Sequence, residues 1–212
     1  TAYIATTKYK FNDYTPALYK TTDYGKTWKN ISSGIPYGAY TRVLREDQTR
    51  RNLLYAGTET GIYISWNGGS SWEPFQLNLP VTPITDLKVH QGDLVVATSG
   101  RGFWVLDDLG LLSQQKVSDD VKLYQPETTI NGFWGSQLSA NNPSFDGTNS
   151  SEGVNPANGV VIYYNLPKLD KDDEVVLEIR NAKNELVNTI TSTRDKNYRR
   201  WDGGPPPAST LS

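Results

Sequence analysis

The segment Leu18-Tyr-Lys-Thr-Thr-Asp-Tyr-Gly-Lys-Thr-Trp28 decides the expected fold, because it returns as Ile62-Tyr-Ile-Ser-Trp-Asn-Gly-Gly-Ser-Ser-Trp72. The two copies lie 44 residues apart at every position and share the pattern Ser/Thr-x-Asp/Asn-x-Gly-x-Ser/Thr-Trp. The matched residues are Thr21, Asp23, Gly25, Thr27 and Trp28, followed by Ser65, Asn67, Gly69, Ser71 and Trp72. A pattern that recurs at this interval predicts a repeat architecture in which each copy is one supersecondary unit.

Strand and turn signals divide the first half of the chain into three such units. In the first unit, strands are expected at Thr1–Thr6, Ala17–Thr21 and Trp28–Ile31, with a polar loop over Lys10–Pro16. The second unit is complete, with strands at Tyr40–Glu46, Leu53–Thr58, Gly61–Ser65 and Trp72–Gln76. The third has strands at Ile84–His90, Asp93–Thr98 and Gly102–Leu106, but Leu109–Leu112 replaces the Gly and Trp of the turn.

Four strands in about 40 residues is the size of one propeller blade. The sequence therefore predicts an all-β fold with part of a β-propeller, about three four-stranded blades over residues 1–112. The first blade lacks its opening strand and the third is degenerate.

Beyond the third unit the composition changes. Residues 113–158 are expected to form a linker or long loop, with a short strand at Val121–Gln125 and a stretch rich in Ser, Asn, Gly and Pro at Ser136–Asn158. Residues 159–212 contain strand signals at Gly159–Pro167, Glu174–Arg180 and Glu185–Ile190. These three strands predict the start of an Ig-like β-sandwich.

Composition excludes several classes of site. The net charge of −2 and the lack of a Lys/Arg block argue against nucleic acid, and no apolar run is long enough for a transmembrane segment. With no Cys there is no disulfide or thiolate metal site, and His90 alone cannot build a His-rich metal site. We therefore expect no metal or cofactor. Because Met is absent even at position 1, we expect this chain to be part of a larger protein.

The turn motif resembles the Asp-box, or BNR repeat, of sialidases and sortilin-type receptors. The segments Tyr19–Trp28, Leu54–Gly61, Gly100–Asp108 and Gly203–Pro207 are similar to bacterial sortilin-like BNR-repeat proteins that are often labelled glycosyl hydrolases. The resemblance implies the C-terminal part of an Asp-box propeller followed by an Ig-like domain. The remaining blades would lie N-terminal to Thr1 or in a separate chain.

The same resemblance implies a bacterial protein that is secreted, periplasmic or at the cell surface. Its partners would be the rest of its own propeller and other envelope proteins or glycans. The family usually has His where this chain has Ser99, so any catalytic role of that His would be missing here.

The motif residues themselves are interpreted as structural. A short Asp side chain accepts hydrogen bonds from backbone N–H groups in its own turn, Gly25 permits positive φ, and Trp28 can pack between blades. Since Asn67 can accept the same bonds without a charge, we expect the motif to brace a hairpin.

The candidate binding residues are Arg42, Arg45, Arg101 and Trp66. An Arg on a strand that lines the channel could meet a carboxylate or a glycan acid group. The alternative is an Arg paired with Glu46 or Asp47 at a solvated edge. Trp66, next to the turn, could stack on a sugar ring or a peptide, as could Trp104, Phe133 and Trp134. These aromatic side chains could equally fill the space between blades.

The candidate catalytic acids are Asp107, Asp108 and Glu59, with Asp13 as a further alternative. A glycosidase needs two carboxyl groups about 5 Å apart for retention or about 6.5–9.5 Å apart for inversion. Adjacent Asp107 and Asp108 on a strand would point to opposite faces, and the alternative for both is a capping or turn role.

Three functions remain open, and the sequence leaves undecided whether the protein is an enzyme. The first is a binding or scaffold part of a large Asp-box propeller protein that recognises protein or glycan. The second is a glycoside hydrolase, sialidase- or xyloglucanase-like, with its active site in the propeller channel. The third is an assembly factor with a stable partner.

Overall fold

The computed structural model describes residues 1–114, 121–129, 159–168 and 173–192. The described chain is all-β, with several small antiparallel sheets, none of them closed. Its helical parts are the 3₁₀ turn η1 (Tyr9–Phe11) and the short helix α1 (Gly110–Gln114). The predicted fold class is thus confirmed at this level. The expected linker Ser136–Asn158 and the tail after residue 192 lie outside the described residues.

The chain divides into two compact units, Thr1–Ser118 with Leu123–Tyr164 and Asp119–Lys122 with Asn165–Ser212. The first unit contains the three sheets predicted by the repeats. The boundaries expected at residues 112 and 158 stay predictions.

The first sheet has the order β1-β2-β3, with β1 at Ala2–Lys8, β2 at Asp13–Thr21 and β3 at Lys29–Asn30. The loop expected at Lys10–Pro16 was wrong, because β2 already begins at Asp13. Lys8 pairs with Asp13 across the strands, and their charged groups lie 3.7 Å apart. Pro16 is tolerated in β2 because the β1–β2 register shifts between Thr6 and Lys8, next to it.

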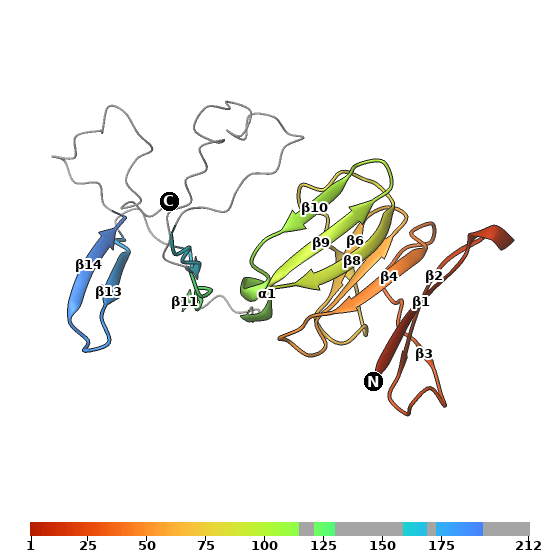
Figure 1. Cartoon of the computed structure of the whole chain (residues 1–212), viewed down its shortest axis with the longest axis horizontal. Helices are drawn as coiled ribbons and strands as arrows, with labels where there is room; N and C mark the ends of the chain where they lie inside the picture. Colours follow the sequence, from red (N-terminus) through yellow and green to blue (C-terminus); the bar gives the residue numbers. More distant parts are fainter. Residues whose placement is uncertain (115–120, 130–158, 169–172, 193–212) are drawn as a thin grey trace. The chain divides into compact units, whose positions relative to one another are not determined.

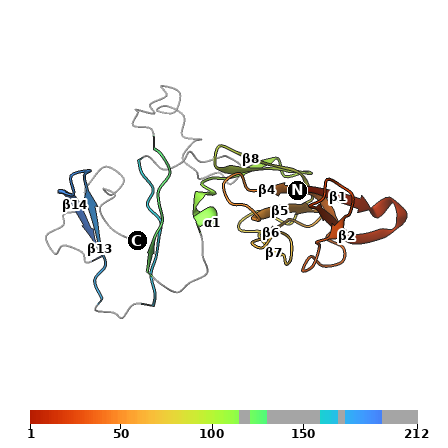
Figure 2. The same ribbon diagram turned by 90° about the horizontal axis from the view of Figure 1, so that it is seen from below.

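The second sheet is an antiparallel meander of β4 (Thr41–Glu46), β5 (Leu54–Thr58), β6 (Ile62–Ser65) and β7 (Glu73–Pro74). Figure 2 shows these four strands in succession. The third sheet contains β8 (Ile84–His90), β9 (Asp93–Thr98) and β10 (Phe103–Leu106) in the order β10-β9-β8. In the third unit α1 follows β10, and among the residues that the structure describes this sheet has three strands.

The three sheets repeat one strand register. In the second sheet the row of paired residues is Leu44, Ala56, Tyr63 and Pro74. The corresponding rows are Ile4, Tyr19 and Asn30 in the first sheet and Leu87, Val96 and Trp104 in the third. Tyr63 and Pro74 follow Tyr19 and Asn30 by the same 44 residues as the turn motif. The sequence repeat is therefore a repeat of strand pairing.

The opening strands of the second and third sheets also share an irregularity. The register shifts between Thr41 and Val43 in β4 and between Ile84 and Asp86 in β8. A bulge leaves one residue out of the ladder and re-aims its side chain, and Arg42 stands at that position in β4. The bulge thus decides where this arginine points.

Hydrophobic residues pack the neighbouring sheets of this unit against one another, and Figure 1 shows the three sheets in succession. One core cluster joins the first two sheets, with members Leu18, Ile31, Ile35, Leu44, Leu54, Ala56, Tyr63 and Trp72. A second joins the second and third sheets, with members Val43, Tyr55, Ile62, Ile64, Ile84, Leu87, Leu94 and Val96. Each fully buried aliphatic side chain stabilises the fold by about 1.5–3 kcal/mol. The middle sheet is therefore covered on both faces.

The rest of the described chain forms two small ladders. β11 (Lys122–Leu123) pairs with β12 (Tyr164–Asn165), so the strands expected at Val121–Gln125 and Gly159–Pro167 are each only two residues long. The hairpin of β13 (Val176–Arg180) and β14 (Leu186–Thr191) agrees with the predicted one. Its turn is held by Asn181 Oδ1, which accepts hydrogen bonds from the backbone N–H groups of Lys183 and Glu185.

Candidate functional site

The first motif forms a closed set of hydrogen bonds inside its own turn. Asp23 Oδ1 accepts bonds from the Thr21 hydroxyl at 2.8 Å and the Thr27 N–H at 2.9 Å. Asp23 Oδ2 accepts a bond from the Thr27 hydroxyl at 2.6 Å, and Thr21 Oγ1 accepts one from the Gly25 N–H at 3.0 Å. These bonds, led by that from the Thr27 hydroxyl, lower the pKa of Asp23 from 3.8 to about 2.

The second motif repeats this arrangement with a neutral amide. Asn67 Oδ1 accepts bonds from the Ser65 hydroxyl at 3.0 Å and the Ser71 N–H at 2.9 Å, and Gly69 N–H donates to Ser65 Oγ at 2.9 Å. One difference is that Asn67 Nδ2 donates to Ser71 Oγ at 2.8 Å, which reverses the direction of the bond made by the Thr27 hydroxyl. The side-chain oxygens of both motifs are thus used within the turn, and the geometry accounts for the motif without a ligand.

The two turns also share their backbone. Tyr24 and Gly25 have φ of 60° and 86°, and Gly68 and Gly69 have φ of 70° and 88°. Two successive left-handed residues favour glycine, and Tyr24 accepts this conformation with its side chain wholly in solvent.

The motif tryptophans differ. Trp72 is 5% exposed, whereas Trp28 is 42% exposed. Trp28 is therefore not packed between the sheets described here, and the expectation that it packs between blades stays a prediction. The physical reason is that Trp72 faces the first sheet, while no described sheet lies on the corresponding face of the first.

Arg42 is brought together with Glu59, one of the candidate catalytic acids. Arg42 Nη2 lies 2.6 Å from Glu59 Oε2, and its Nε donates to the same oxygen at 2.8 Å. The guanidinium also lies over the Tyr40 ring and donates to the Tyr40 hydroxyl at 3.3 Å. The expected partners Glu46 and Asp47 were wrong for Arg42. Their carboxylates instead accept bonds from their own loop, at the N–H groups of Asn52 and Thr49.

Arg45 forms an ion pair with Asp86, with 2.7 Å between Nη2 and Oδ1. This pair joins β4 to β8 and is more exposed than the pair of Arg42 and Glu59. Arg101 is exposed in the turn before β10, where its backbone O accepts a bond from Trp104 Nε1 at 2.9 Å.

Trp66 is half-buried. Its Nε1 donates to Glu73 Oε1 at 2.6 Å, and the guanidinium of Arg50 lies 5.3 Å from the ring centroid. Both the edge and one face of the indole are thus engaged within the protein, which leaves less of the ring for a sugar. Of the other candidate aromatic residues, Trp104 lies in β10, and Phe133 and Trp134 lie outside the described residues.

Asp107 and Asp108 follow β10 and do not lie on a strand, so the expected opposite orientation on a strand was wrong. Asp108 has φ of 57°, and its N–H donates to Asp93 Oδ1 at 3.1 Å. Burial, followed by the charges of Asp93 and Asp108, raises the pKa of Asp107. Burial and the charge of Asp108 likewise raise the pKa of Glu127. At this end of the third sheet four carboxyl groups therefore interact through their charges, those of Asp93, Asp107, Asp108 and Glu127. Asp13, the fourth acid proposed from the sequence, lies apart from them at the start of β2, beside Lys8.

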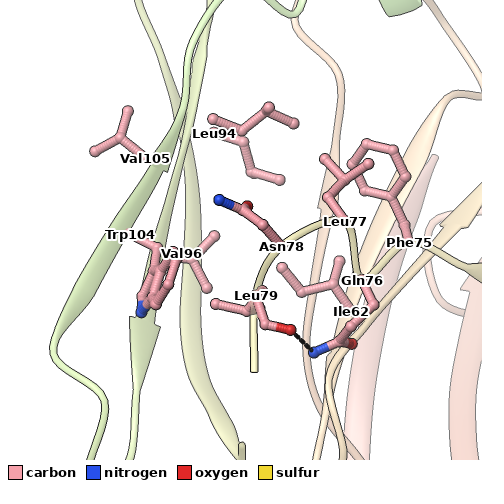
Figure 3. Close-up of a pocket in the computed structure, with 11 residues that line it drawn as sticks. Ile62, Phe75, Gln76, Leu77, Asn78, Leu79, Leu94, Val96, Trp104 and Val105 are labelled. Carbon is pink, nitrogen blue, oxygen red and sulfur yellow. Dashed lines mark hydrogen bonds between the residues drawn. The ribbon is translucent and has the colours of Figure 1, made fainter. Parts of the chain in front are cut away.

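A cavity that was not predicted from the sequence lies between the second and third sheets. It has a volume of about 50 Å³. One side is formed by the segment from Phe75 to Leu79 and the other by Val96, Trp104 and Val105, as Figure 3 shows. Gln76 Nε2 holds this segment in place by donating to Leu79 O at 2.8 Å and Pro80 O at 2.9 Å.

In the part of the chain that the structure describes, no group of three or more Asp, Glu or His side chains could hold a metal ion. None of the helices described is long and apolar enough to cross a membrane. No protein-family model matches the chain, and no curated protein matches it either.

Proposed function

We propose that the three sheets are consecutive blades of an Asp-box β-propeller and that the protein binds protein or glycan as a scaffold of the cell envelope or exterior. The observation that supports this proposal is a sheet that recurs along the chain. Its strand register, its hydrogen-bonded turn and its packing against the neighbouring sheet are each repeated. In this proposal the hairpin of β13 and β14 belongs to an Ig-like sandwich that follows the propeller.

The two outer sheet faces support further blades on either side. Ile4 and Trp28 are each 42% exposed on the first sheet, while Ala56 and Trp72, their counterparts on the second, are 0% and 5% exposed. On the third sheet Phe103 is 81% exposed. A neighbouring blade would cover these apolar side chains, as the first sheet covers Ala56 and Trp72.

Binding is favoured over catalysis because Glu59, one of the candidate catalytic acids, is already held in an ion pair. Its carboxylate is engaged with Arg42 at 2.6 Å. The opening strands β4 and β8 carry exposed charged side chains, among them Arg45, Asp86 and Lys88. In the proposed propeller these strands line the channel, where such groups would recognise a polar partner.

A glycoside hydrolase is the second candidate. The observation that favours it is the raised pKa of Asp107, since a general acid must hold its proton near neutral pH. Asp108 or Glu127 would then be the second carboxylate.

The two functions are separated by assaying the protein against chromogenic glycosides and polysaccharides and, in parallel, on a glycan array. We expect no turnover, and binding that weakens in the charge-reversed variant Arg45→Glu. Turnover that is abolished by Asp107→Asn, Asp108→Asn or Glu59→Gln would contradict the binding function and establish the hydrolase. A stable co-purifying protein partner would instead favour an assembly factor.

A further inference from the structure

The cavity beside β10 lies in the interface between the second and third sheets. Its place corresponds to that of Trp72 in the interface between the first and second sheets. Its lining residues Phe75, Leu77 and Leu79 follow Ile31, Ser33 and Ile35 by the repeat interval of 44 residues. Across the cavity, Val96 and Trp104 hold the positions of Ala56 and Tyr63 in the shared register. The two interfaces are therefore equivalent. Trp72 occupies the one between the first and second sheets, and the corresponding place between the second and third sheets is a cavity.

Trp72 fills its interface through side chain and backbone together. The indole is 5% exposed in the core cluster of Ile31 and Ile35. Its Nε1 donates to Ile31 O at 2.5 Å, and the Trp72 backbone N–H donates to Ser33 O at 3.0 Å. The residues after it form β7 along the edge of β6. The occupant of this place is thus a short strand that carries an indole.

Within the described residues, the third sheet has neither that strand nor that indole. Leu109–Leu112 stands where the turn and tryptophan would be, and β10 has no outer strand among the residues described. The carbonyl oxygens of Phe75 and Leu77, which correspond to the two acceptors for Trp72, accept no hydrogen bond from a described residue. Leu77 is 64% exposed and Val105 is 56% exposed. The third sheet therefore offers an apolar slot, two backbone hydrogen-bond acceptors and the edge of β10 at one place.

We propose that this slot, with the free edge of β10, binds an extended segment of a partner polypeptide through a tryptophan side chain. The indole lies in the open slot against the lining of the cavity and donates its N–H to Phe75 O, while the tryptophan backbone N–H donates to Leu77 O. The partner's following residues add a strand to β10, a recurrent mode of peptide recognition. A free aromatic molecule would supply the ring but not the backbone donor or the strand. This site lies apart from Arg42 and Arg45 and does not depend on the proposed function of the opening strands.

The test uses the peptide that fills the equivalent interface, with the sequence of residues 67–76, Asn-Gly-Gly-Ser-Ser-Trp-Glu-Pro-Phe-Gln. Fluorescence polarisation of the fluorescein-labelled peptide against the 212-residue chain should show saturable binding. A peptide with Ala in place of Trp should bind at least about tenfold more weakly, because a buried Trp is a typical hot spot. A Phe peptide, which lacks the N–H, should fall between the two.

A variant of the protein whose slot is already occupied by its own side chain provides a second test. The side chain of Asn78 is exposed and projects from one wall of the cavity toward the other in Figure 3, so Asn78→Trp should occupy the slot without burying a polar group. This variant should lose about tenfold or more in affinity. Lys26→Trp, in the exposed turn of the first sheet, should leave affinity unchanged. Thermal unfolding of each variant establishes that it is folded.

Two results would overturn the proposal. The first is equal binding of the Trp and Ala peptides, or affinity unchanged by Asn78→Trp in a folded protein. The second concerns the tryptophans at positions 134 and 201 of this chain. Binding that appears only after Trp134→Phe and Trp201→Phe would assign the slot to this chain itself rather than to a partner.

Discussion

The carboxylate of Asp23 should make the first turn sensitive to acid. Its pKa is lowered to about 2, so the ionised side chain stabilises the fold above its ordinary pKa of about 4 and loses this contribution as pH falls from about 4 to 2. Asp23→Asn should keep most of the turn, as Asn67 does, but remove this pH dependence. The measurement is the thermal midpoint of both proteins between pH 6 and pH 2.

The second turn supplies the control. Asn67→Asp should add acid sensitivity in the same range, because the Ser71 hydroxyl can rotate to donate as the Thr27 hydroxyl does. If Asp23→Asn and the native protein lose stability in parallel as pH falls, the Asp23 bonds are not formed in solution.

At the same scale, the two ion pairs of the opening strand should differ in strength. Arg42 and Glu59 are each 30% exposed, whereas Arg45 and Asp86 are 44% and 62% exposed. A double-mutant cycle with Arg42→Ala and Glu59→Ala should give a coupling energy on the order of 1 kcal/mol, and the pair of Arg45 and Asp86 roughly 0.3 kcal/mol. Urea unfolding measures both cycles. A larger coupling for the exposed pair would contradict the geometry.

At the scale of the element, the hairpin depends on what its tryptophan faces. Trp72→Ala should destabilise the protein by about 3–5 kcal/mol, because it empties a buried site and removes the bond to Ile31 O. Trp28→Ala, at the matching position, should cost about 1 kcal/mol or less, because Trp28 is 42% exposed. Chemical denaturation of the two variants compares them directly. Equal losses would mean that Trp28 is covered in solution.

The strands themselves were largely predictable. β8 and β9 have the expected boundaries, and β4 to β6 differ from expectation by one residue at an end. Alternation of apolar side chains and turn residues is a local signal. The failures were strands whose length depends on a partner, such as β3 and β12, which have two paired residues each.

At the scale of the whole molecule, stability should be greatest in the middle sheet. Every residue of β5 and β6 is buried, and both faces of this sheet carry a neighbour. The hairpin of β13 and β14 has two strands and mostly exposed side chains, and such a hairpin alone is marginally stable.

Amide hydrogen exchange should follow this order. We expect the slowest exchange in β5 and β6, intermediate exchange in β1 and β9, and the fastest in β13 and β14. Mass spectrometry of the exchanged peptides makes the comparison within one sample. Protection of β13 and β14 equal to that of β5 would show that a further packed layer covers the hairpin.

The sequence by itself determined the repeat, the braced turns and the all-β class, because each depends on residues close together in the chain. Asp23 and Asn67 satisfy their own turns, and the 44-residue interval carries the strand register with it. Only the tertiary structure decided that Arg42 meets Glu59, that Trp28 is exposed while Trp72 is buried, and that a cavity lies beside β10. These outcomes depend on which sheet faces which, and two copies of one motif acquire different surroundings when only one of them has a neighbour on that face.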